Sequence, residues 1–169
     1  MPKTTASSGS LIMASDHISD FFARYPGFPY DPNNEVWSEY HRLVRHVGWK
    51  PEGKKEKAAN NAFRAALGRQ FSYQYGTSDN KLENLQRLCQ KLGVDPIPAS
   101  VAACKKVIGK FHVNIIDFID CERTGNPVHV FKTVRQLAAY TQHEGKIFSK
   151  REAKNNALLR FLLRSIFNH

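Results

Sequence analysis

The chain has 169 residues, of which 41% are hydrophobic and 24% charged, and its formal net charge is +10. This length fits one ordinary domain, which can bury about two thirds of the surface of its unfolded chain without a disulfide or a metal. No apolar run approaches the roughly 18 residues of a membrane span, and the first residues lack the apolar core of a secretory signal. The sequence therefore excludes a membrane-spanning or wholly disordered protein, and it predicts a non-secreted protein of the nucleus or cytoplasm.

The positive charge is concentrated in two blocks. Residues 41–70 carry a net charge of +6 and residues 146–169 carry +5, whereas residues 14–40 carry −4. Such blocks attract nucleic acid or an acidic protein surface. The sequence does not determine whether the two blocks lie on one face of the molecule or are neutralised internally by the acidic segment.

The three cysteines do not form a recognisable disulfide or zinc pattern, because their number is odd and no pair has C-x-x-C spacing. Cys89 shares a helical stripe with leucines, and Cys104 lies among valines and an isoleucine. Both positions predict small core side chains, and reduced thiols fit a protein of the cytosol or nucleus.

We expect an all-α fold, with one compact domain of about six to seven helices over residues 15–169 and a disordered tail at residues 1–14. A break into two helical subdomains near residues 95–98, Asp-Pro-Ile-Pro, is an alternative. The first helix begins near Asp16 and must end before Pro26, because the residue before a proline disfavours the helical conformation.

Helical periodicity continues through the middle of the chain. A second helix carries one apolar face formed by Val36, Tyr40, Leu43 and Val47. A third extends from about Lys54 to Tyr73, with a polar stripe formed by Lys54, Lys57, Asn61 and Arg64. Shorter helices are predicted at about residues 79–92 and 99–108.

The last third of the chain contains two capping boxes, Thr133 to Gln136 and Ser149 to Glu152, and each predicts a helix start. We expect the second box to open one continuous final helix. Residues 113–119 fit either a helix or a buried strand, because short apolar runs do not distinguish the two. The β-prone pieces VHVF and KIF could pair as one very short two-stranded ribbon.

No catalytic, nucleotide-binding or zinc-binding motif is present, so we predict no catalytic residue, no cofactor and no metal. The least implausible constellation for an enzyme is Asp117 and Asp120 with nearby His112. Two carboxylates three residues apart can perform acid–base chemistry, but they more often form a solvated face or a helix cap.

Aromatic residues are interleaved with the first basic block, since 12 of the 19 lie between Phe21 and Tyr75. Nucleic-acid-binding proteins combine Lys and Arg on phosphates with exposed rings that stack on bases. Most of these rings fall on predicted core faces, so we expect one or two functional rings at most. Exposure is expected mainly at helix ends, at Trp49, Phe71, Tyr73 and Tyr75.

Several segments, YPGFPYDP (25–32), W-x-x-Y-H-R-L-x-x-x-x-G-W (37–49), CKKVIGKFHVNIIDFID (104–120), FKTVRQLAAYT (131–141) and GKIFSK (145–150), form a characteristic series. Together they resemble a group of small uncharacterised intracellular proteins of filamentous (ascomycete) fungi. The resemblance covers about residues 20–167 and implies a fungal intracellular protein. It implies no activity and no site residues.

The sequence favours a non-enzymatic helical module that binds nucleic acid through Lys and Arg faces. The contacts predicted for this function are Lys54, Lys57, Arg64, Lys150, Lys154, Arg160 and Arg164. A protein-interaction or adaptor module is the alternative, with a partner held in a groove between helices or by Tyr25, Phe28, Tyr30 and Trp49. An enzyme with an Asp/His site is the second alternative.

Overall fold

The computed structural model describes the backbone of residues 16–167 and the side chains as far as Leu163, so the predicted tail at residues 1–14 lies outside the described part. The described residues form nine helices and no strand: α1 (His17–Phe22), α2 (Val36–Val47), α3 (Lys54–Tyr75), α4 (Leu82–Lys91), α5 (Val101–Ile108), α6 (Ile115–Thr124), α7 (Val134–Glu144), α8 (Lys150–Ala153) and α9 (Ala157–Phe167). The all-α prediction is confirmed.

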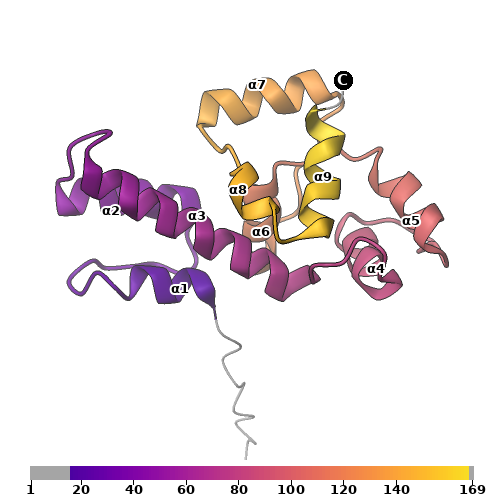
Figure 1. The fold of residues 1–169 in the computed structure, drawn as a ribbon, viewed down its shortest axis with the longest axis horizontal. Helices are drawn as coiled ribbons and strands as arrows, with labels where there is room; N and C mark the ends of the chain where they lie inside the picture. Colours follow the sequence, from indigo (N-terminus) through magenta and orange to yellow (C-terminus); the bar gives the residue numbers. More distant parts are fainter. Residues whose placement is uncertain (1–15, 168–169) are drawn as a thin grey trace, which may run out of the picture.

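The 22-residue helix α3 is the axis on which the other helices are assembled (Figure 1). Helices α1, α4, α6 and α8 all pack against it, and α5 packs on α4. The ring of Phe63 on α3 stacks on that of Tyr40, with centroids 4.5 Å apart. Phe63 also meets three further rings, those of Phe21, Phe22 and Trp37. This aromatic cluster joins α1, α2 and α3 at one end of the molecule.

One hydrophobic core extends from Ile18 to Leu163 and includes side chains from both sides of residues 95–98. The chain therefore passes through these residues without dividing its core. The alternative of a subdomain break finds no support in this packing.

Helix capping explains where the last elements begin and why the predicted final helix is interrupted. Thr133 accepts the N–H of Gln136 and Ser149 accepts that of Arg151, so both residues cap helices where predicted. The Gln136 side chain bonds to the N–H of Lys132 and not to that of Thr133, so the complete capping box does not form there. The Asn156 side chain then accepts the N–H of Leu159 at 2.8 Å. This second cap starts α9, so the single helix predicted from Ser149 was wrong: α8 and α9 are separate, which helps to raise the helix count above six to seven.

Residues 115–119 of the stretch 113–119 belong to helix α6, and the strand alternative is wrong. The Asn114 side chain accepts the N–H groups of Ile116 and Asp117, at 3.0 and 3.2 Å, and thereby starts α6. The predicted ribbon between VHVF and KIF is absent from the described residues, where Phe131 instead forms an isolated antiparallel bridge with His112. No helix formed by residues 16–167 is long and apolar enough to cross a bilayer.

Replacement of Phe63 by alanine tests the aromatic cluster. We expect F63A to lower the free energy of unfolding by about 3–5 kcal/mol, because the fully buried ring leaves a cavity among its neighbours. Y73A on the same helix is the matched control, since the Tyr73 side chain is 52% exposed and its removal should cost less than about 1 kcal/mol. Urea denaturation measures both, and equal losses would contradict the packing described.

The thiols offer a second test of the core. Cys89, Cys104 and Cys121 are buried and unbridged, and burial raises the pKa of Cys89 to about 11 and raises that of Cys121. Since the thiolate is the reactive form, we expect no thiol to react rapidly with Ellman's reagent at pH 8 in the folded protein, and three to react in denaturant. A rapidly labelled thiol in native buffer would show that the core is open there.

Candidate nucleic-acid interface

One side of α3 carries a stripe of polar and small residues. Lys57, Asn61, Arg64, Gly68 and Ser72 follow one another at intervals of four, three, four and four residues, which places them on the same side of the helix. The predicted polar stripe therefore extends farther along α3 than the sequence pattern suggested. Its first half is exposed at Lys57 and Asn61.

The segment 147–158, which contains α8, runs alongside the second half of this stripe (Figure 1). Arg64 donates a hydrogen bond to the carbonyl of Ile147. A Cβ added to Gly68 would lie only 3.3 Å from that of Glu152, so the missing side chain permits the close approach of α8. Farther along, the Asn156 amide donates to the Ser72 hydroxyl at 2.9 Å. The chain thus follows α3 in register over this whole length.

This packing brings the two basic blocks together through hydrogen bonds between residues more than 80 positions apart in the chain. Lys54 and Lys57 are exposed at the start of α3, and Arg69 is exposed beside the α8 contact. Lys150, Arg151 and Lys154 are exposed on α8 and at its end. Arg160 of α9 is also exposed, and its guanidinium donates to the carbonyl of Lys154. We refer to these seven residues as the basic face: Lys54, Lys57, Arg69, Lys150, Arg151, Lys154 and Arg160.

Five of the seven cations of the basic face are not neutralised by a carboxylate of the described part of the chain. Within the described part of the chain, Lys54, Lys57, Arg69, Arg151 and Lys154 form no ion pair with a carboxylate. By contrast, Lys105 pairs with Asp79 at 3.0 Å, and Lys91 pairs with Glu122 at 3.1 Å. Unpaired cations on one face produce a local positive potential that attracts polyanions.

Arg64 differs from the other predicted contacts. Its Nε donates to the Asn60 side chain at 2.7 Å, and its guanidinium lies over the Trp37 ring, 5.7 Å from the centroid. Burial lowers the pKa of this guanidinium. With its further bond to the Ile147 carbonyl, Arg64 holds the segment 147–158 against α3, so we assign it a positioning role. The predicted contact Arg164 lies beyond the last described side chain.

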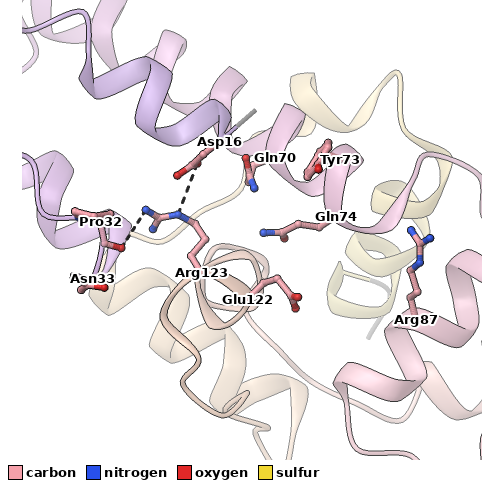
Figure 2. Close-up of a pocket in the computed structure, with 9 residues that line it drawn as sticks. All are labelled: Asp16, Pro32, Asn33, Gln70, Tyr73, Gln74, Arg87, Glu122 and Arg123. Atoms are coloured by element: carbon pink, nitrogen blue, oxygen red, sulfur yellow. Dashed lines mark hydrogen bonds and ion pairs between the residues drawn. The ribbon is translucent and has the colours of Figure 1, made fainter. Parts of the chain in front are cut away.

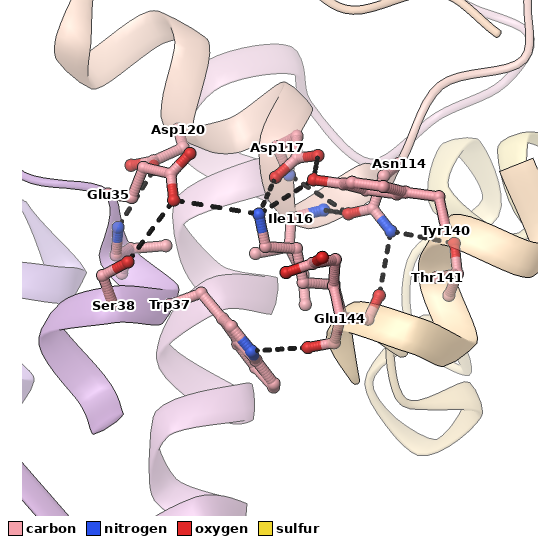
Figure 3. Close-up of polar contacts among 12 residues, drawn as sticks. Glu35, Trp37, Ser38, Asn114, Ile116, Asp117, Asp120, Tyr140, Thr141 and Glu144 are labelled. Atoms are coloured by element: carbon pink, nitrogen blue, oxygen red, sulfur yellow. Dashed lines mark hydrogen bonds and ion pairs between the residues drawn. The ribbon is translucent and has the colours of Figure 1, made fainter.

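The loop that leads into α8 is anchored by a buried lysine. The Lys146 ammonium donates to Asp117 at 2.8 Å and to the Tyr140 hydroxyl at 3.0 Å, and its side chain is only 5% exposed. The Tyr140 hydroxyl also donates to Asp117, at 2.6 Å, and the Asn114 amide donates to Thr141 (Figure 3). A second bond from Asn114, to the Lys146 carbonyl at 2.9 Å, fixes the backbone of this loop.

Lys146 keeps its positive charge within this network. Burial alone lowers the pKa of Lys146, but its hydrogen bonds to Asp117 and Tyr140 outweigh that effect, so the pKa is raised above its ordinary value. Burial and the bond to Asp117 raise the pKa of Tyr140. The lysine is therefore an ammonium and the tyrosine a neutral donor at physiological pH, as this hydrogen-bond pattern requires.

The carboxylates considered for catalysis are engaged within the protein. Asp120 accepts the N–H of Val36, the first residue of α2, at 3.0 Å, and it accepts Arg123 at 2.9 Å. Asp117 and Asp120 line a hollow of about 150 Å³, but His112 is not among its lining residues. The three side chains of the predicted constellation therefore do not converge. The described residues hold no group of three His, Cys, Asp or Glu side chains suited to a metal.

The aromatic–proline segment predicted for partner binding is packed inward. Phe28 is buried, and Tyr25, Tyr30 and Trp49 are partly buried against the core. Tyr30 stacks on Phe22 with ring centroids 4.3 Å apart. These rings do not form the contiguous exposed patch on which the adaptor hypothesis depended.

The sequence-based prediction missed Arg69 of the basic face and gave Tyr73 no specific role. It placed Arg151 in the basic start of the last helix but not among the predicted contacts. Arg69 follows Lys57, Asn61 and Ala65 at four-residue spacing, so continuing that row along α3 would have found it. Arg151 adjoins the predicted Lys150. Of the four helix-end rings, only Tyr73 is strongly exposed; Phe71 and Tyr75 are buried in the core.

The chain matches no family model, no curated protein and no solved structure in comparisons with known proteins. The resemblance to fungal proteins therefore stays a prediction.

Replacement of Lys146 by methionine tests the anchor of the loop. We expect K146M to lower the free energy of unfolding by about 3 kcal/mol, because it leaves the Asp117 carboxylate without its buried cation. K81M is the matched control: Lys81 forms an exposed ion pair with Glu83, at 3.8 Å, whose loss should cost less than about 1 kcal/mol. Urea denaturation at pH 7 compares the two variants.

The raised pKa of Lys146 determines how the stability difference between wild type and K146M depends on pH. A lysine ammonium has a pKa of about 10.4 in the unfolded chain, and the folded protein raises the pKa of Lys146 above that value. The stabilisation that Lys146 provides is therefore complete below about pH 10.4. It is lost only as the pH rises through the folded pKa. The difference between wild type and K146M should therefore be the same at pH 7 and pH 9. A difference that vanished by pH 9 would contradict the assigned charge state.

Proposed function

We propose that the protein is a non-enzymatic module whose basic face binds the phosphate backbone of nucleic acid. The observation that supports this proposal is the alignment of the segment 147–158 with α3, which gathers exposed cations from both basic blocks of the sequence. Such cations bind phosphates and release counterions from the nucleic acid. No reading-helix motif stands out in the sequence, so we expect binding with little sequence preference.

The other functions considered for this protein are less well supported. The constellation predicted for an enzyme does not converge, because His112 does not line the hollow of Asp117 and Asp120. The aromatic–proline segment is packed against the core. An acidic protein surface is the remaining alternative partner for the basic face. A polyglutamate chain and a nucleic acid of matched charge distinguish these partners, because only the nucleic acid offers phosphates and bases.

A salt titration tests the proposal. If about six cations contact phosphates, the affinity for DNA or RNA should fall about a thousandfold between 50 and 200 mM salt. We expect the double variant K150Q/K154Q to weaken binding and to reduce the slope of log K against log salt by about 1.4–1.8, because each phosphate that is no longer neutralised lowers the slope by about 0.7–0.9. Fluorescence anisotropy with a labelled oligonucleotide measures both quantities.

The matched control is K106Q/K110Q, which removes the same charge from exposed lysines on and just after α5, a helix that packs on α4 away from α8 (Figure 1). This variant should keep the slope of the wild type. Equal effects of the two double variants would mean that the net charge, and not the basic face, binds the polyanion. Absence of binding at 50 mM salt would reject the proposed function.

A further inference from the structure

Tyr73 is the one strongly exposed aromatic ring among the described side chains. It lies near the end of α3, and 52% of its surface is accessible. The His17 ring meets it edge to face, with centroids 6.2 Å apart and an angle of 75° between the planes. An exposed ring is unusual here, because its neighbours Phe71 and Tyr75 on the same helix are buried. Its position therefore calls for an explanation other than packing.

The ring borders two hollows on the surface. The first, of about 460 Å³, lies between α3 and the segment after α8, where Tyr73 and Arg69 face Asn155. Because Asn155 directly follows Lys154, this hollow adjoins the basic face, although Glu152 also lines it and offsets the charge of Arg69. Arg69 precedes Tyr73 by one helical turn, at a distance from which both side chains can contact the same ligand.

Tyr73 also lines the second hollow, of about 670 Å³ (Figure 2). Its charges cancel, because Arg87 and Arg123 are balanced by Asp16 and Glu122. Arg123 is held by Asp120 at 2.9 Å, and Glu122 is held by Lys91 at 3.1 Å. A neutral hollow has little attraction for a phosphate, but it can receive an uncharged polar group.

Amide side chains supply the polar groups of this second hollow. The Gln70 side-chain oxygen accepts the N–H of His17 at 3.0 Å, which leaves its NH₂ group directed into the hollow beside Gln74 (Figure 2). Asn33 adds an exposed amide at the opposite rim. Amides offer both donors and acceptors, which are the groups that the edge of a nucleobase requires. A ring for the face of a base thus adjoins amides for its edge.

We infer that the nucleic acid bound at the basic face is single-stranded, with one base stacked on Tyr73 and its edge directed into the second hollow. This inference rests on the proposed function, since the basic face must hold the phosphates. Single-strand-binding proteins combine a positively charged track with aromatic side chains on which bases stack. A base inside a duplex has both faces covered by its neighbours, so a duplex cannot use the ring.

The experiment compares a labelled single strand of 20 nucleotides, as DNA and as RNA, with the DNA duplex of the same sequence, at 50 mM salt. We expect Y73A to weaken binding of the single strand about 5- to 150-fold, because stacking on one ring contributes about 1–3 kcal/mol. Binding of the duplex should be unchanged. Y73F keeps the ring and should retain the single-strand affinity of the wild type. I97A, which truncates another exposed apolar side chain, should have no effect.

The outcomes separate this inference from the proposed function. The inference is wrong if K150Q/K154Q weakens binding but Y73A does not, or if the duplex binds as tightly as the single strand. In either case the proposed binding of nucleic acid at the basic face still stands. A mononucleotide that binds as tightly as the strand would also overturn it, because the hollow would then hold a free nucleotide. If no nucleic acid binds the wild type at 50 mM salt, both proposals fail. Circular dichroism verifies that each variant is folded.

Discussion

The close packing of the segment 147–158 along α3 is the constraint on which the surface of this protein depends. Gly68 permits the approach, while Arg64 and Asn156 provide hydrogen bonds at either side of it. Because α8 has only four residues, it has little stability of its own and takes its position from these contacts. The arrangement of the exposed cations is therefore a property of tertiary packing.

Buried polar groups fix the relative positions of other helices through hydrogen bonds. Asp120 of α6 accepts the first N–H of α2. Glu35, the N-cap residue of α2, forms no side-chain hydrogen bond with the start of that helix. Trp37 donates to the Glu144 carbonyl at the end of α7, at 3.0 Å (Figure 3). Together with the Lys146 network, these bonds fix the helices that flank α3. A buried polar group left unpaired is costly, so such bonds specify one arrangement of the helices.

Local signals in the sequence were sufficient for much of the helical structure. The caps at Thr133 and Ser149 and the apolar face of α2 follow from patterns within a few residues. The local pattern of residues 113–119 did not distinguish a helix from a strand. The break between α8 and α9 was missed, because the apolar face of the last helix suggested continuity. The Asn156 side chain interrupts it by capping α9 while its amide bonds to Ser72, a residue 84 positions away.

The sequence by itself determined the helical class, the buried cysteines and the excess of positive charge, since these depend on composition and on short-range periodicity. The tertiary structure decided which charged residues share a face, which are consumed in internal contacts, as Arg64 and Lys146 are, and which ring stays outside the core. Periodicity gives the side of a helix on which a residue lies. Only packing between distant segments determines whether that side meets a neighbour or the solvent.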